Sequence, residues 1–258
     1  MIFENRNIYG QFNTRLLGLC LLAVMAISCT ETEKKEAAIH LDSTADSTET
    51  ETGYSEMERA MINQGLKDIQ QIVPDIMVDL KYSSSDNFFK TDAYGDTHRA
   101  FLQEKPATAL KVAQYLLKKK NPNYTLLIYD AARPLSVQKV MWESLDTIPS
   151  RNRKNYVADP NIGSIHNYGC AVDLSIFDLS TQKELDMGTP FDYFGDLAYP
   201  RKEKQQLENG KLSVNQVMNR RLLREIMLTA GYDPTTSEWW HFNFYPLARA
   251  KKTYRLIE

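Results

Sequence analysis

The chain has 258 residues, of which 43% are apolar and 25% are charged, and its formal net charge at pH 7 is -2. This length and composition fit one globular domain with a sizeable core and exclude a chain that is disordered throughout. The sequence contains no basic stripe of the kind that would indicate a nucleic-acid partner.

The first 28 residues are predicted to be a lipoprotein signal peptide. Two arginines precede the apolar run LLGLCLLAVMAI, which at about a dozen residues is too short to span a bilayer comfortably. The stretch AISC, which overlaps the end of this run, resembles a bacterial lipobox, with the departure that alanine stands where leucine is commonest. We therefore expect lipidation of Cys29 and an exported, membrane-anchored lipoprotein in the periplasm. A retained membrane anchor is the alternative.

Residues 29–53 are predicted to form a flexible polar tether. The segment is rich in Ser, Thr, Asp and Glu, and it has too few large apolar residues to offset the entropy of an ordered chain. His40 lies in this tether and is therefore expected to be solvated. Cys20 falls in the signal core and Cys29 is the lipid site, so Cys170 remains alone in the mature domain without a disulfide partner. We expect Cys170 to be a small core residue.

The folded domain is predicted to span residues 54–258. Apolar spacing predicts helices over residues 55–69, 107–121, 136–145 and 215–232. Extended segments or strands are predicted over residues 73–82, 124–134, 170–179 and 238–245. Helices and strands alternate without βαβ regularity, which favours a single α+β domain with an antiparallel sheet flanked by helices.

The stretch SIHNYGCAVDLSIF places His166 seven residues before Asp173, with Gly169 between them to let the backbone bend. Strand alternation puts Asp173 on one face with two small residues, alanine and serine, and puts the large apolar residues on the other face. Asp173 therefore faces away from the apolar side, where its small neighbours leave room for an ion.

The stretch SEWWHFNF places Glu238 three residues before His241. His166, Asp173 and His241 would supply two nitrogens and one carboxylate oxygen, three ligands that leave the fourth position of a tetrahedral zinc site open for water. A carboxylate beside that water is what a hydrolase needs as a general base, a role that Glu238 could fill. Spacing alone favours these roles no more than ordinary core or surface roles.

These motifs resemble those of a known family. The pattern SxHxxGxAxD, which includes His166 and Asp173, and the ExxH of Glu238 and His241 resemble the zinc D-alanyl-D-alanine dipeptidases. That family belongs with the D,D-carboxypeptidases of hedgehog-like fold. The segments PDIMVDLKYSSSDNF, YDAARP and DMGTPFD resemble further signatures of the dipeptidases, so the resemblance covers residues 73–244.

The resemblance implies one Zn²⁺ ion per chain, with His166, Asp173 and His241 as its ligands, and a general base at Glu238. Arg133 would correspond to the arginine that stabilises the tetrahedral intermediate, a role that suits its permanent charge. Three further residues would contact the substrate: Asp192, which would receive its ammonium group, and Ser164 and Tyr82.

Three functions remain open at this point. The first is hydrolysis of the dipeptide D-Ala-D-Ala by a zinc dipeptidase. The second is a D,D-carboxypeptidase or endopeptidase that acts on longer peptidoglycan stems, and the third is a non-catalytic, wall-binding lipoprotein. Glu238 argues against a pure binding protein, and Asp192 favours the small dipeptide because a longer stem would leave this acid without a partner. Membrane contact is expected through the N-terminal lipid anchor only.

One further histidine and two tryptophans are expected to have structural rather than catalytic roles. His98 lies outside every motif and is predicted to be a surface histidine. Trp239 and Trp240 flank the site and are predicted to be packing rings that exclude water.

The lipobox interpretation predicts that labelled palmitate enters the wild-type protein in growing cells and does not enter a Cys29→Ala variant, because the variant has no thiol at the lipidation site. Immunoprecipitation followed by autoradiography measures this directly. Equal labelling of the two proteins would rule out Cys29 as the lipid site.

Overall fold

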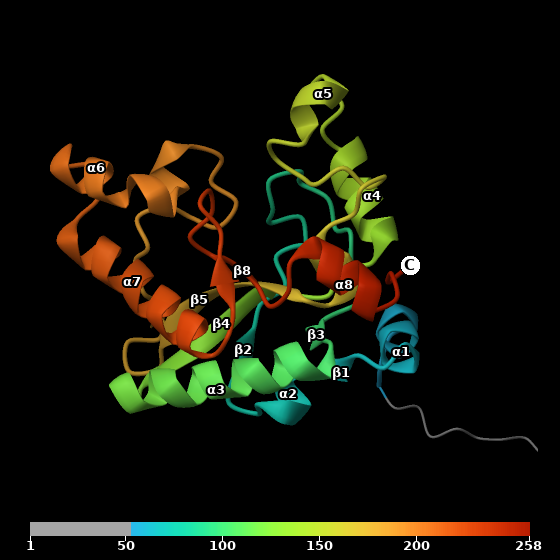
Figure 1. Cartoon of the computed structure of the whole chain (residues 1–258), viewed down its shortest axis with the longest axis horizontal. Helices are drawn as coiled ribbons and strands as arrows, with labels where there is room; N and C mark the ends of the chain where they lie inside the picture. Colours follow the sequence, from blue (N-terminus) through green and yellow to red (C-terminus); the bar gives the residue numbers. More distant parts are fainter. Residues whose placement is uncertain (1–52) are drawn as a thin grey trace, which may run out of the picture. The chain divides into compact units, whose positions relative to one another are not determined.

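The computed structural model describes residues 53–258, so the predicted signal peptide, the tether, Cys29 and His40 lie outside the described residues. The described part folds into helices arranged around a mixed sheet (Figure 1). Its helices are α1 (Glu56–Asn63), α2 (Ile69–Ile72), α3 (Glu104–Lys120), α4 (Leu135–Glu143), α5 (Ser150–Arg153), α6 (Glu203–Glu208), α7 (Val214–Thr229) and α8 (Leu247–Thr253). Short 3₁₀ turns are η1 (Ile165–Tyr168), η2 (Asp196–Ala198) and η3 (Pro200–Lys202).

The strands are β1 (Lys67–Asp68), β2 (Met77–Val78), β3 (Phe101–Leu102), β4 (Tyr124–Asp130), β5 (Ala171–Asp178), β6 (Lys183–Glu184), β7 (Asp233–Pro234) and β8 (His241–Asn243). The main sheet has the order β2-β4-β5-β8-β7, β6 pairs with the end of β5, and β1 pairs with β3 separately. Within the main sheet only β2 and β4 are parallel, because the connection between them includes α3 and returns the chain to its starting side. The predicted α+β domain with an antiparallel sheet is confirmed, apart from this one pair.

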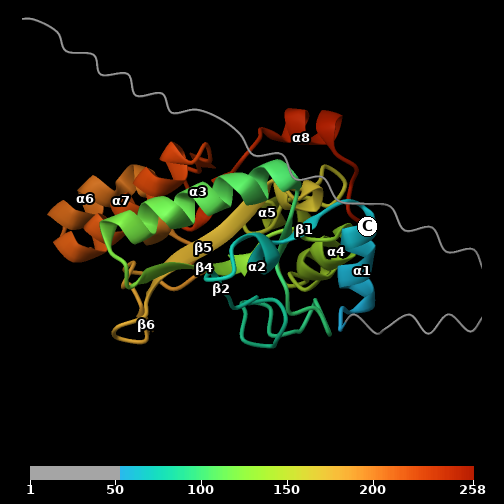
Figure 2. The same cartoon turned by 90° about the horizontal axis from the view of Figure 1, so that it is seen from below.

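Helix α3 covers one face of β4 and β5, and α4 and α5 lie on the other side of the sheet (Figures 1 and 2). The core under α3 combines helix residues at helical spacing with every second residue of β5: Ala107, Leu110, Ala113, Leu117, Val172, Leu174 and Ile176. Successive strand residues point to opposite faces, so Asp173 points away from α3. This is the orientation predicted from the alternation of residues in β5.

The predicted helices are all present, but some predicted elements are too long. The helix expected over residues 55–69 ends at Asn63, because Gly65 has a φ of 92° and residues 67–68 pair as β1. Only Met77–Val78 of the extended segment 73–82 forms a strand. In the last predicted strand, Trp239 and Trp240 form a bend with both rings buried, so β8 begins only at His241.

Two single-residue predictions are confirmed. Cys170 is fully buried and is the only cysteine among residues 53–258, which agrees with a core role. His98 is exposed, which agrees with a surface role.

No helix within this described range has both the length and the apolar character that crossing a bilayer requires.

Candidate active site

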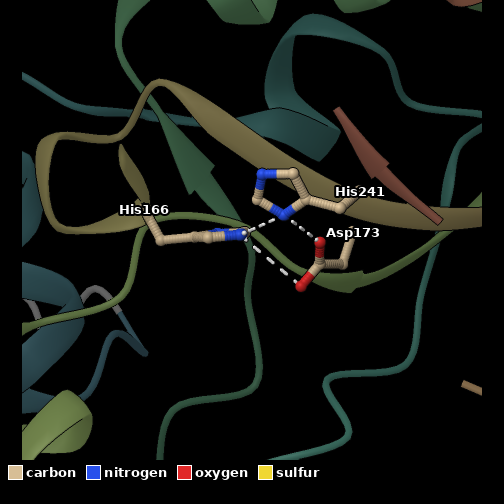
Figure 3. A group of neighbouring side chains, drawn as sticks. All are labelled: His166, Asp173 and His241. Carbon is tan, nitrogen blue, oxygen red and sulfur yellow. Dashed lines mark hydrogen bonds and ion pairs between the residues drawn. The ribbon is translucent and has the colours of Figure 1, made fainter. Parts of the chain in front are cut away.

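Three potential metal ligands converge from distant parts of the chain (Figure 3). His166 lies in η1, Asp173 in β5 and His241 in β8, and their donor atoms all lie within 4.8 Å of one another. The pairing of β5 with β8 places Asp173 directly opposite His241. His241 Nδ1 is 2.9 Å from Asp173 Oδ1 and 3.2 Å from His166 Nε2. The structure therefore brings together the predicted ligand set.

The other nitrogen of each imidazole ring is occupied by a hydrogen bond. His166 Nδ1 lies 2.6 Å from the carbonyl oxygen of Ala131, and His241 Nε2 lies 2.9 Å from Oδ1 of Asn243. A carbonyl oxygen only accepts, so each of these nitrogens carries the proton. The lone pairs of a neutral His166 Nε2 and a neutral His241 Nδ1 then point toward the Asp173 carboxylate. Two such nitrogens and a carboxylate oxygen fit a metal cation, and each ring is held in the orientation that binding requires.

The electrostatics of this cluster favour a cation. Burial would raise the pKa of Asp173, but the two neighbouring imidazoles outweigh burial and hold it well below its usual range. Burial would lower the pKa of His241, but the carboxylates of Asp173 and Glu238 outweigh burial and raise it to about 9. The negative potential that attracts a proton to His241 also attracts a metal ion, and the two compete for Nδ1.

All eight residues predicted for the metal, the chemistry and the substrate line one cavity of about 150 Å³: Tyr82, Arg133, Ser164, His166, Asp173, Asp192, Glu238 and His241. Met141 of α4 and Tyr156 after α5 complete its wall on the side of the sheet opposite α3, and Trp240 also lines it. Sites for drug-sized ligands typically measure about 300–1,000 Å³. The cavity therefore suits a much smaller molecule.

Glu238 lies in the loop just before β8, beside the proposed ligands. Its Oε2 is 3.9 Å from His241 Nδ1, and its side chain keeps 36% of its surface exposed. Burial raises the pKa of Glu238, and the Asp173 carboxylate raises it further against the opposing effect of the imidazoles. A carboxylate with a raised pKa is a stronger base, so Glu238 is placed to accept a proton at the edge of the cluster.

Arg133 is a buried cation held by a buried acid that the sequence analysis missed. Its Nε and Nη2 both donate to Asp130 Oδ2, and its Nη1 donates to Gln138 Oε1 at 2.9 Å. Tyr94 Oη donates to the other oxygen of Asp130 at 2.6 Å. Burial would lower the pKa of Arg133, but Asp130 more than offsets this and raises it, so the guanidinium stays charged. The position of Asp130 in YDAARP, three residues before Arg133, was the available signal.

Asn243 is the second functional residue that sequence reasoning missed. It lies two residues beyond His241 in β8, so both side chains point to the same face of the strand. This spacing lets its amide oxygen reach the ring nitrogen of His241. The sequence HFN shows that a histidine and an asparagine are two residues apart. This spacing places their side chains on the same face only if the segment is a strand, which the sequence alone did not establish.

Asp192 and Tyr82 form a hydrogen-bonded pair at the cavity wall, with Tyr82 Oη donating to Asp192 Oδ2 at 2.9 Å. Burial, with the charge of Asp173 added, raises the pKa of Asp192 well above its usual range. Its backbone has a φ of 58°, in the left-handed region that few non-glycine residues adopt.

Ser164 lines the cavity and also caps η1 by accepting from the backbone N–H of His166 at 3.3 Å.

The segment that carries Asp192 is fixed to α7. Arg220 of α7 is almost fully buried, and its Nε donates to the carbonyl oxygen of Met187 at 2.6 Å. At Gly188, where φ is 82°, a Cβ atom would lie 2.4 Å from Leu212 Cδ2. The left-handed φ favours glycine at this position, and the contacts at Met187 and Gly188 hold the start of the segment that leads to Asp192.

Comparison with known proteins places this site in a family. The peptidase M15 family model, described as "D-ala-D-ala dipeptidase", matches residues 62–255. The D-alanyl-D-alanine dipeptidase of Escherichia coli (strain K12) is 32% identical over 187 residues, which cover 70% of this chain and 88% of that protein. The D-alanyl-D-alanine dipeptidase of Enterococcus faecium is 28% identical over 197 residues, which cover 69% of this chain and 90% of that protein.

Among solved structures, "VanYB in complex with D-Alanine-D-Alanine" overlaps with 59% of this chain and 76% of that chain, with 15% sequence identity and a TM-score of 0.36. The family match covers most of the described domain, and it includes every residue that lines the cavity. The chain therefore belongs to the D-Ala-D-Ala dipeptidase family of metallopeptidases.

Proposed function

We propose that this peptidase is a zinc enzyme that hydrolyses the dipeptide D-Ala-D-Ala to two molecules of D-alanine. The observation that carries the proposal is the cavity of about 150 Å³, in which a metal-ligand set, a candidate base, a buried arginine and a carboxylate for an ammonium group all meet. A free dipeptide offers a matching carbonyl, a leaving amine and an ammonium group within one small molecule.

His166, Asp173 and His241 would hold the zinc ion. Their two nitrogens and one oxygen are the donor set of catalytic zinc sites that leave one position open. Bound there, zinc would polarise the scissile carbonyl and lower the pKa of a water molecule to about 7. The hydrogen bonds from the rings to Ala131 and Asn243 fix the tautomer of each neutral ring, so that His166 Nε2 and His241 Nδ1 are the nitrogens available to the metal.

Glu238 would act as the general base. It would take a proton from the water that attacks the carbonyl and then deliver this proton to the leaving amine. Two properties support this role: its Oε2 lies beside the ligand cluster, 3.9 Å from His241 Nδ1, and burial raises its pKa.

Arg133 would stabilise the negative charge that develops on the carbonyl oxygen. Its guanidinium lies in the cavity wall, with Nη2 3.8 Å from Asp173 Oδ2, and its charge is fixed by Asp130. A cation that is already held in place by a buried acid needs little reorganisation when charge develops. Asp130 would therefore act as a positioning residue for Arg133.

Asp192 would receive the ammonium group of the dipeptide, with Tyr82 and Ser164 as further substrate contacts. Burial and the charge of Asp173 raise the pKa of Asp192 despite the opposing effects of Tyr82 and Arg133, and a substrate ammonium would stabilise its charged carboxylate. The alternative, a D,D-carboxypeptidase or endopeptidase acting on longer stems, is less well supported. A stem substrate has an amide where the dipeptide has its ammonium, and the cavity is small.

We also propose that the enzyme is an exported lipoprotein anchored through Cys29. The basis is the lipobox-like AISC after a short apolar run. In that location the enzyme would act on dipeptides released from the cell wall.

Glu238→Gln is expected to keep one zinc ion per chain but to lose activity by at least about 10²-fold, because the amide cannot accept the proton. Zinc content by elemental analysis and kcat on D-Ala-D-Ala measure the two properties separately. Glu184→Gln, at an exposed glutamate outside the cavity, is the matched control and should behave as wild type. Zinc loss in Glu238→Gln would make Glu238 a ligand, and full activity would exclude it as the base.

Wild-type enzyme is expected to cleave free D-Ala-D-Ala much faster than its N-acetyl form, because only the free dipeptide has an ammonium to pair with Asp192. Asp192→Asn should shrink this preference, mainly by slowing the free dipeptide. The comparison uses kcat/KM for both substrates, where each tenfold change equals about 1.4 kcal/mol of transition-state stabilisation. If wild type cleaves N-acetylated or stem-length D,D-peptides as well as the free dipeptide, the carboxypeptidase alternative is correct.

A further inference from the structure

A second, larger hollow lies away from the active site. This groove of about 770 Å³ runs between the start of α3, the end of α7 and the start of α8. Its floor is apolar and is formed mainly by six residues: Ala109, Val112, Ala230, Gly231, Phe244 and Tyr245. None of these residues lines the catalytic cavity. The groove and the exposed sides of α3 and α8 that border it are together called the α3/α8 face.

Exposed apolar side chains extend this groove onto the surface of the helices. Val112 keeps 44% of its surface exposed and Tyr115, one turn further along α3, keeps 59%. Leu228 near the end of α7 keeps 48% exposed, and the ion pair between Lys120 and Glu225 shows that this part of α7 lies alongside α3. An apolar patch of this kind on the surface of a folded domain indicates an interaction site.

The rim of the α3/α8 face is basic, although the whole chain has a net charge of -2. Helix α3 contains five lysines and one glutamate, and α8 contains one arginine and two lysines with no acid. Lys118 and Lys120 pair with acids on neighbouring elements. Lys105, Lys111 and Lys119 of α3 have no acidic partner within residues 53–258, and neither do the three cations of α8, Arg249, Lys251 and Lys252. Glu104 is the one acid that lines the groove.

Helix α3 and the catalytic cavity lie on different sides of the sheet, whereas α8 packs against η1, the turn that carries His166. The buried residues of α3 pack on the face of β5 that carries Val172 and Leu174, whereas Asp173 points to the opposite face. The cavity is walled by α4 and by residues after α5, which lie across the sheet from α3 (Figure 1). A surface bound at α3 would therefore leave the mouth of the cavity accessible.

We propose that the α3/α8 face docks on an anionic lipid bilayer. The lysines and arginine of the rim bind lipid phosphates, and Tyr115, Val112 and the groove lie at the boundary between headgroups and acyl chains. The unpaired cations of the rim favour a negatively charged partner. The exposed apolar residues among them favour a lipid bilayer over a polyanion, because the charged surface of a wall polymer or of duplex nucleic acid would leave these residues without an apolar contact. This contact is additional to the N-terminal lipid anchor expected from the sequence.

The test uses the full-length chain with a tryptophan on either side of the molecule. Tyr115→Trp places the probe on the α3/α8 face, and Tyr193→Trp places it next to Asp192, on the side of the cavity. The two positions have similar exposure, 59% and 41%, and both variants keep the same N-terminal segment and the same three native tryptophans. Each variant is mixed with vesicles of acyl-brominated phosphatidylglycerol or phosphatidylcholine, whose bromines quench tryptophan only at the depth of the acyl chains.

We expect loss of emission from Tyr115→Trp with phosphatidylglycerol, little loss with phosphatidylcholine, and little loss from Tyr193→Trp with either lipid. Adding Lys105→Glu, Lys111→Glu and Lys252→Glu should abolish the quenching and leave dipeptide hydrolysis unchanged, because none of these lysines lines the cavity. Adding Lys204→Glu and Lys211→Glu, which lie on and just after α6, is the matched control and should change nothing.

Three results would overturn the proposal. Equal quenching of the two tryptophan variants would mean that the N-terminal segment alone holds the chain at the vesicle. Absence of quenching in both would exclude docking. Sedimentation with phosphatidylglycerol vesicles without quenching at Tyr115→Trp would show an anion-binding surface for phosphates or polyanions and no insertion at the bilayer.

Discussion

The pairing of β5 with β8 is the constraint on which the site depends, because its register places Asp173 directly opposite His241. A shift of one residue would turn His241 to the other face of the sheet and separate the two ligands. The same strand places Val172 and Leu174 in the core beneath α3, so the hydrophobic packing that stabilises the fold also fixes this register. The alternation of side-chain directions along β5 therefore decides both which residues pack under α3 and which residue faces the proposed metal site.

Around this register, the cavity is lined by three carboxylates, those of Asp173, Asp192 and Glu238, and by one permanently charged cation, Arg133. Asp130 binds Arg133, Asp173 faces the two imidazoles and the proposed metal, and Asp192 would receive the ammonium of the proposed substrate. A buried charge without a partner is costly, which is the physical reason for proposing a metal ion and a substrate ammonium at this site. Under the proposed function, this complementarity favours a small zwitterion over a longer, blocked peptide.

Much of the site could be predicted from the sequence, because His166, Asp173, Glu238 and His241 lie in motifs that resemble those of a known family, whereas their spacing alone was not decisive. Asp130 and Asn243 could not be assigned, since their roles come from contacts with Arg133 and His241 that require the folded strands. The short lengths of β2 and β8 reflect tertiary packing, such as the buried bend at the two tryptophans, rather than local preference. The basic face escaped notice because α3 and α8 are far apart in the sequence and meet only in the fold.

The central claim is that His166, Asp173 and His241 hold one zinc ion in the cavity. Anomalous diffraction at the zinc absorption edge, from crystals of wild-type protein purified without chelator, tests it most directly. The account predicts a single peak at about 2.0–2.2 Å from His166 Nε2, His241 Nδ1 and a carboxylate oxygen of Asp173, with Glu238 outside the coordination sphere. A peak bound by other residues, or no peak in crystals of catalytically active protein, would contradict it.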